Sequence, residues 1–271
     1  MIHRTLHALA HELRLFFVAL QFLTRVPVPA WVGFEPDWLN QSARHFPAVG
    51  LLVGIVAAAV LGAGHALLTP AVAVGLSMAA TLLLTGGFHE DGFADTCDGL
   101  GGAVSRERAL AIMKDSRIGA YGAMGLVMML GLKAATLAAL PLAWAVPALL
   151  LSHTASRGAA VVLIRVLPYA GDAEHAKAKP LARTVARAGV ATALAWVAAV
   201  AVALYVWQAA WAPAVVGSLL LAAAGTACCA RWLHRRLGGT TGDTLGATQQ
   251  ITELLALLAW LAASQVAAGT T

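Results

Sequence analysis

Seven stretches of mostly apolar residues dominate this sequence, and each is about the 20-residue length that a helix needs to cross a bilayer. They lie at roughly 46–68, 71–87, 120–140, 143–166, 190–208, 212–230 and 251–268. The runs of Ala, Leu and Val do not alternate with polar residues, which excludes the strands of a β-barrel. Only 11% of the residues are charged, less than half of the roughly 25% typical of soluble domains. The sequence therefore predicts an all-α, polytopic membrane bundle, with 1–271 as a single membrane domain.

The charged residues indicate how this bundle is oriented. The connections near 69, 141 and 210 contain no charged residue, whereas the connections on the other side collect the Lys and Arg residues. By the positive-inside rule, the basic side is cytoplasmic. Residues 6–23 interleave Glu12 and Arg14 with Leu and Phe, so we expect an amphipathic helix that lies in the membrane interface.

The stretch "GGFHEDGFADTCDGLGG" (86–102) follows directly on an uncharged apolar segment, at the predicted cytoplasmic face. Its residues Asp91, Asp95 and Asp98 are spaced i, i+4, i+7 and therefore share one helix face. Carboxylates at this spacing repel one another, more strongly at the edge of a membrane. No Lys or Arg occurs between residues 45 and 105 to compensate them. We therefore expect one or two divalent cations against this face.

The ligand types favour a hard cation. Three carboxylates with only His89 nearby, and no Cys-based zinc spacing, favour Mg²⁺, with Mn²⁺ as a substitute. Magnesium typically bridges carboxylates to substrate phosphates. This predicts phosphoryl-group chemistry, in which the metal neutralises charge, within an acidic and basic active-site segment at 88–119.

The second half of that segment, "RERALAIMKDSRIGAYGAMG", supplies positive charge. Lys114 and Arg117 flank Asp115 and Ser116 just before the third apolar stretch. An Arg fork matches phosphate oxygens and Lys acts as a point charge, although both could simply anchor the next helix at the membrane surface. Asp115 is a candidate metal ligand or general base, and the sequence leaves both roles open.

Two further places carry polar side chains that suit a substrate. The Gly/Thr-rich stretch at 238–250, "GGTTGDTLGATQQ", is predicted as a cytoplasmic loop that leads into a helix N-terminus. There Thr241 and Asp243 could meet an anion. Alternatively, Asp243 or Thr244 could cap the helix, or Asp243 could reach the metal site. Within the fourth stretch, Arg157 lies one turn from His153, and ionisable residues inside a membrane usually point into the protein. For Lys133 in the third stretch, snorkelling is the default expectation.

The motifs together resemble a known family. "GGFHEDGFADTCDGLGG", "MKDSRIGAYG", "QFLTRVPVP" and "GGTTGDTLGA" are similar, in this order, to the adenosylcobinamide-GDP ribazoletransferases, the cobalamin synthases. The resemblance implies a Mg²⁺-dependent enzyme of the bacterial inner membrane that acts late in cobalamin biosynthesis. Its substrates would be adenosylcobinamide-GDP and α-ribazole or its 5′-phosphate. The products would be GMP and adenosylcobalamin or its 5′-phosphate.

The segment "DTCDG", Asp95 to Gly99, also matches the D-x-x-D-G opening of the CDP-alcohol phosphotransferases. It departs from that pattern at Gly101 and Gly102, and the second Asp pair is absent. The expected metal ligands are Asp91, Asp95, Asp98 and Glu90. The expected catalytic residues are Asp98 and Asp115. The expected substrate contacts are Lys114, Ser116, Arg117, His89, Arg157, Asp243 and Thr241.

Two other functions compete with this interpretation. A CDP-alcohol phosphotransferase of phospholipid synthesis should carry the second Asp pair, and a membrane transporter should place its carboxylates near the bilayer midplane. Besides the substrates, we expect the lipid bilayer as a partner and no nucleic acid. Gly125 and Gly131 permit close helix contacts, which is compatible with a homo-oligomer.

Overall fold

A computed structural model describes residues 2–171 and 181–269, and these residues are almost entirely helical. The helices are α1 (Ile2–Leu23), α2 (Pro36–Ser42), α3 (Phe46–Leu67), α4 (Pro70–Thr85), α5 (Phe88–Leu100), α6 (Arg106–Met113), α7 (Ala120–Ala139), α8 (Leu142–Val166), α10 (Arg187–Trp207), α11 (Ala212–Leu237) and α12 (Gly242–Gly269). Within the described residues, β-structure is limited to an isolated bridge between Tyr169 and Thr240. The predicted all-α fold is confirmed.

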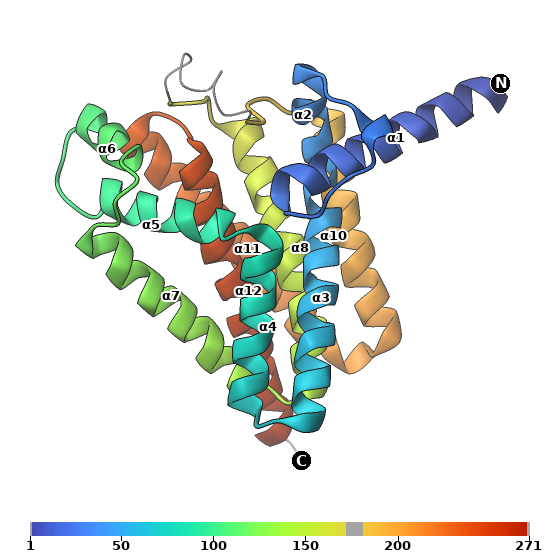
Figure 1. Ribbon diagram of the computed structural model, residues 1–271. Coiled ribbons are helices and arrows are strands. Elements are labelled where there is room, and N and C mark those ends of the chain that lie inside the picture. Colours follow the sequence, from blue (N-terminus) through green and yellow to red (C-terminus); the bar gives the residue numbers. More distant parts are fainter. Residues whose placement is uncertain (1, 172–180, 270–271) are drawn as a thin grey trace.

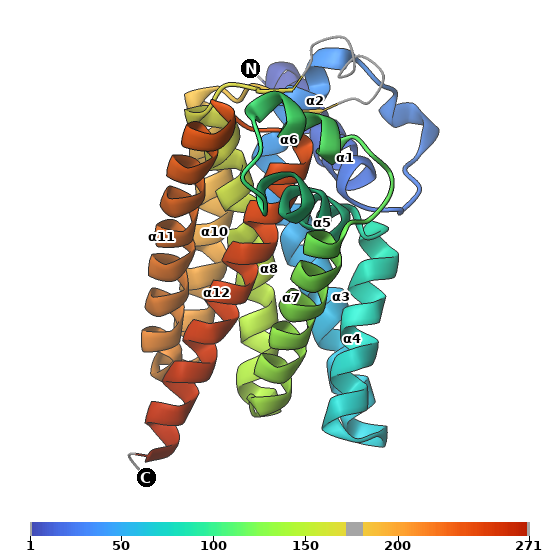
Figure 2. The ribbon, with the colours of Figure 1, turned by 90° about the vertical axis from the view of Figure 1, so that its left-hand side faces the viewer.

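The long helices run side by side as a bundle, and α1, α2, α5 and α6 lie together at one end of it (Figures 1 and 2). Among the described residues, six helices are long and apolar enough to cross a membrane. A seventh crossing results if α4 and α5 form one span that is bent by 89°. The polytopic helical bundle is therefore confirmed, with the second predicted span as its irregular member.

The centre of the bundle is α8, which is buried along most of its length. Helix α3 approaches α8 closely because Gly50 and Gly54 of α3 face the backbone of α8. A Cβ on Gly54 would lie 2.8 Å from the carbonyl oxygen of Leu149. Small residues at such crossings allow close van der Waals packing, which is a main source of helix association in lipid. Gly125 serves the same purpose within the chain, since α7 packs there on Cys97 of α5.

The bend between α4 and α5 depends on two glycines. Gly86 and Gly87 have φ angles of +71° and +70°, a left-handed conformation that costs little only for glycine. The Arg25 side chain occupies the space that a Cβ on Gly86 would need, and the Arg25 backbone N–H donates to the Leu84 carbonyl at 2.7 Å. The turn therefore sends α5 across the end of the bundle and fixes Arg25 beside it.

Two predicted boundaries differ from the structure. α11 continues to Leu237 rather than ending near 230, and α12 begins at Gly242 rather than near 251. Most of the predicted loop at 238–250 is therefore helical. The polar residues of "GDTLGATQQ" did not favour a span, yet they lie on buried turns of α12 where other helices supply their partners.

Candidate active site

An open groove of about 590 Å³ lies where α4 turns into α5 and the α6–α7 connection passes by. Asp91 and Asp95 enter it from successive turns of α5, Arg25 enters from the segment after α1, and Ser116 enters from the connection. Two carboxylates and a guanidinium thus face one cavity. Such a set can bind a phosphorylated ligand, either directly through the Arg fork or through a cation held by the carboxylates.

Asp98 lies on the same helix, and its carboxylate binds the backbone at the start of α7. Its two carboxylate oxygens accept the backbone N–H groups of Gly119 at 2.7 Å and Gly122 at 2.8 Å. These N–H groups belong to the start of α7, where the helix dipole and unpaired donors favour a negative charge. Asp98 is not among the residues that line the groove. Its predicted roles as a metal ligand and catalytic residue stay predictions, and in the structure its carboxylate holds the start of α7.

The connection between α6 and α7 contains an exposed ion pair. Arg117 donates to both carboxylate oxygens of Asp115, at 3.0 and 2.7 Å, and its backbone N–H adds a third bond at 3.1 Å. These hydrogen bonds lower the pKa of the Asp115 carboxyl to about 2. A general base works best with a pKa near the working pH, so this arrangement suits a structural pair better than a base. Lys114, the C-cap residue of α6, is exposed beside it.

His89 and Glu90 point away from the groove, into the bundle. Glu90 accepts a hydrogen bond from the Gln250 amide at 2.9 Å. It lines an interior cavity of about 30 Å³, enough for a water molecule or two. His89 is 4% exposed and borders the same cavity. Glu90 was predicted as a ligand of the same metal as Asp91, but the two side chains face different spaces.

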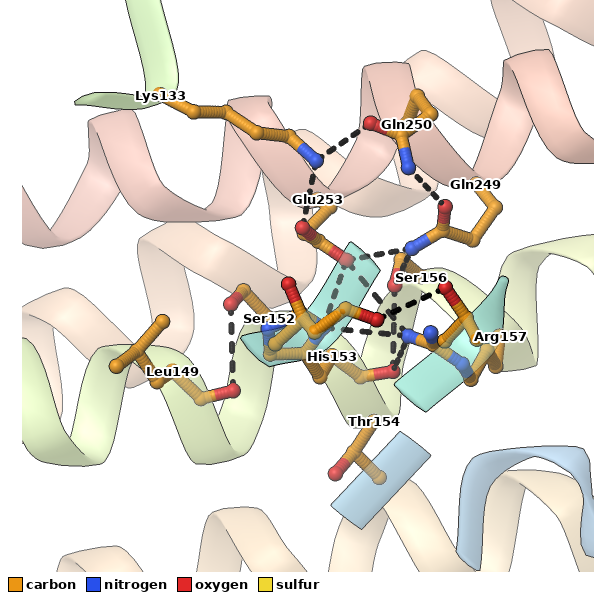
Figure 3. A network of polar contacts seen from close by, with 12 residues as sticks. Lys133, Leu149, Ser152, His153, Thr154, Ser156, Arg157, Gln249, Gln250 and Glu253 are labelled. Atoms are coloured by element: carbon orange, nitrogen blue, oxygen red, sulfur yellow. Dashed lines mark hydrogen bonds and ion pairs between the residues drawn. The ribbon is translucent and has the colours of Figure 1, made fainter. Parts of the chain in front are cut away.

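The interior cavity is surrounded by a network of buried polar side chains, which Figure 3 shows. Lys133 of α7 donates to the Glu253 carboxylate and to the side-chain amide oxygen (Oε1) of Gln250 on α12, both at 2.6 Å. Lys133 and Glu253 are each 5% exposed. The predicted snorkelling of Lys133 is therefore wrong, because a buried partner on α12 satisfies its charge.

Helix α8 closes the same network (Figure 3). His153 Nδ1 lies 2.9 Å from the second Glu253 oxygen, and Arg157 lies 3.6 Å from that oxygen. The Gln249 amide donates to Glu253 and to Ser156. Arg157 is 3% exposed and borders the cavity, as predicted from its position one turn from His153. The buried groups thus join α5, α7, α8 and α12 beneath the groove.

Thr241 is the residue before the first turn of α12, and it caps that helix. Its hydroxyl accepts the Thr244 N–H at 3.3 Å, and the Thr244 hydroxyl accepts the Thr241 N–H at 2.8 Å, the reciprocal arrangement of a capping box. Asp243 packs against Gly92 of α5, where a Cβ would lie 2.9 Å from the Asp243 Cα. α12 therefore begins directly behind the helix that carries Asp91 and Asp95.

Sequence reasoning missed Arg25, Gln250 and Glu253. Arg25 belongs to "QFLTRVPVP", a motif with no evident chemistry of its own. Glu253 could have been found, because it is the acidic residue within the last span and Lys133 is a basic residue within another. Charges inside a membrane are usually paired with one another.

Comparison with known proteins identifies relatives over nearly the whole chain. A family model for cobalamin-5-phosphate synthase matches residues 15–261. A protein of Leptothrix cholodnii named adenosylcobinamide-GDP ribazoletransferase is 60% identical over 261 residues, which cover 94% of this chain and 97% of that protein. A protein of Vibrio cholerae with the same name is 43% identical, over 94% of this chain and 95% of that protein. No solved structure matches the chain.

Proposed function

Because the chain belongs to the cobalamin-5-phosphate synthase family of transferases, we propose that it joins α-ribazole, or its 5′-phosphate, to adenosylcobinamide-GDP. The hydroxyl oxygen of the ribazole attacks the phosphorus next to the corrinoid, and the bond from that phosphorus to the GMP oxygen breaks. GMP leaves, the hydroxyl proton passes to solvent, and adenosylcobalamin or its 5′-phosphate is formed. Family membership favours this enzyme over a transporter or a CDP-alcohol phosphotransferase.

The observation that carries this proposal is the groove that brings Asp91, Asp95, Arg25 and Ser116 together. The Arg25 guanidinium is placed to bind oxygens of the pyrophosphate, a geometry that a planar fork favours. The Ser116 hydroxyl can donate to the same group. Lys114, two residues before Ser116 on the same connection, adds positive charge near the groove, which would attract a polyanionic substrate. The charge of Arg117 is compensated by its pairing with Asp115.

The groove also suits the expected magnesium ion. Within the part of the chain that the structure describes, no three His, Cys, Asp or Glu side chains are arranged to hold a metal. Mg²⁺ commonly uses one or two carboxylates and completes its shell with water and substrate phosphates. Asp91 and Asp95 would hold it, and Mn²⁺ would be a substitute. When bound, the ion would neutralise charge on the phosphates.

We place the groove at the cytoplasmic face of the bacterial inner membrane. Its lining residues belong to α5 and to the segments next to it in space, and α5 and α6 lie at one end of the bundle (Figure 1). Basic residues lie at that end as well, such as Arg25 after α1, Arg106 at the start of α6 and Arg235 in the last turn of α11. The opposite connections contain no charged residue, so the positive-inside rule supports this orientation.

The test is turnover by the full chain in nanodiscs with adenosylcobinamide-GDP and α-ribazole, with and without Mg²⁺. We expect metal-dependent release of GMP together with the cobalamin product. Asp95→Asn should lower kcat by about a hundredfold or more, as loss of charge stabilisation commonly does. Glu107→Gln, an exposed carboxylate on α6 outside the groove, is the matched control. Folded wild-type protein without turnover would refute the proposal.

A further inference from the structure

A second groove lies beside the candidate active site and is lined mostly by apolar residues. Its volume is about 770 Å³. Phe22 of α1, Val28 and Phe34 of the segment after it, and Phe88 of α5 contribute to its walls, and Gln21 contributes an amide. Phe34 is 60% exposed and Phe88 is 40% exposed. Aromatic rings left open to this extent around a hollow are typical of ligand sites.

The two grooves adjoin each other. Phe88 lines both of them, and the Phe22 ring meets it edge to face at a centroid distance of 5.4 Å. Arg25 lines the candidate active-site groove, called the carboxylate groove here because it contains Asp91 and Asp95, and Val28 lines the apolar groove. Three residues of chain span at most about 11 Å. A ligand with its pyrophosphate at Arg25 can therefore reach the apolar groove through a short arm.

The proposed substrate has this shape. In adenosylcobinamide-GDP, a short amide-linked propanol arm joins the pyrophosphate to a corrin ring, whose faces are rich in methyl groups and whose edge carries amides. We propose, on the basis of the proposed function, that the groove between α1, α2 and α5 binds this macrocycle. Phe34 and Phe88 contact its apolar surface, and Gln21 pairs with an edge amide.

This assignment explains a specificity that the carboxylate groove alone does not supply. Two carboxylates and an arginine recognise a pyrophosphate whatever is attached to it. Contact between the macrocycle and the aromatic side chains would select the corrinoid, because apolar and aromatic contact adds binding energy only for a ligand with a matching surface. The competing occupant of such a groove near the membrane surface is a lipid acyl chain.

Steady-state kinetics of Phe34→Ala in nanodiscs tests the assignment. Loss of one aromatic contact should raise the KM for adenosylcobinamide-GDP roughly fivefold to tenfold, with the KM for α-ribazole and kcat unchanged. Gln21→Ala should act in the same direction and more weakly. Trp232→Ala, which removes an exposed ring of α11 outside the groove, is the control. Phe34 is exposed, so its loss should not impair folding.

Equilibrium dialysis with cobinamide, which lacks the GDP part, separates the possible outcomes. If the wild type binds cobinamide and Phe34→Ala binds it more weakly, the assignment is supported. This holds even if the protein shows no turnover and the proposed function has failed. Normal turnover with an unchanged KM in Phe34→Ala overturns the groove and leaves the proposed function standing. Absence of cobinamide binding until lipid is removed would assign the groove to an acyl chain and overturn the inference.

Discussion

The buried ion pair of Lys133 and Glu253 predicts both the direction and the size of the change in unfolding free energy when either residue is replaced. Lys133 makes two charge-assisted hydrogen bonds, to Glu253 and to Gln250, both 2.6 Å long. Each bond of this kind contributes about 1.5–3 kcal/mol. Glu253 keeps His153 and Gln249 as partners when Lys133 is removed. We therefore expect Lys133→Met to lower the free energy of unfolding by about 3 kcal/mol, at the lower end for a broken buried pair.

Glu253→Leu should lower the free energy of unfolding by more, about 4–5 kcal/mol, because it leaves the buried Lys133 charge without its carboxylate partner. Arg157 and His153 lose the same acceptor. When Lys133→Met is added to Glu253→Leu, stability should rise, because the second substitution removes an uncompensated buried charge. The coupling energy between the two sites should therefore be larger than the cost of Lys133→Met alone, that is, at least about 3 kcal/mol.

The measurement is reversible unfolding of the four proteins of this cycle in mixed micelles of detergent and SDS. Leu132→Met is the control, since Leu132 lies on the same helix and is 45% exposed. Its unfolding free energy should match that of the wild type. A loss of less than about 1 kcal/mol in the unfolding free energy of Lys133→Met would contradict this prediction. A double mutant that is less stable than Glu253→Leu alone would contradict it as well.

Two other predictions concern the membrane-surface segment. Asp98→Ala removes the acceptor of the Gly119 and Gly122 N–H groups and should lower the free energy of unfolding by about 1–3 kcal/mol. Amide hydrogen exchange at the start of α7 should become faster, and unchanged exchange there would contradict the prediction. The Asp115 carboxyl has a pKa of about 2, below its ordinary 3.8, because Arg117 donates to it. Its contribution to stability is therefore complete above pH 3.8 and is lost as the pH falls through 2. The pH profile of kcat from 5 to 9 should accordingly be the same in Asp115→Asn, and a lost titration step would refute this.

The helices and their order along the chain were determined largely by the sequence. Apolar length and the absence of alternation suffice to predict spans, because a helix satisfies its own backbone hydrogen bonds in lipid. The spacing of Asp91 and Asp95 was likewise enough to place both on one helix face, and the structure brings both into one groove. These are local properties, so they can be read without knowledge of the packing.

The use of each polar side chain was decided by the tertiary structure. Asp98 continues the same acidic face, but the start of α7 arrives there and takes its oxygens. Glu90 is adjacent to Asp91 in sequence, yet the bend at Gly86 and Gly87 turns it toward Gln250, 160 residues away. The partner of a charge in a low-dielectric interior is whichever opposite charge packing brings within a few ångströms. For Lys133 that partner is Glu253, on a helix that begins more than a hundred residues later, and only the folded bundle brings the two together.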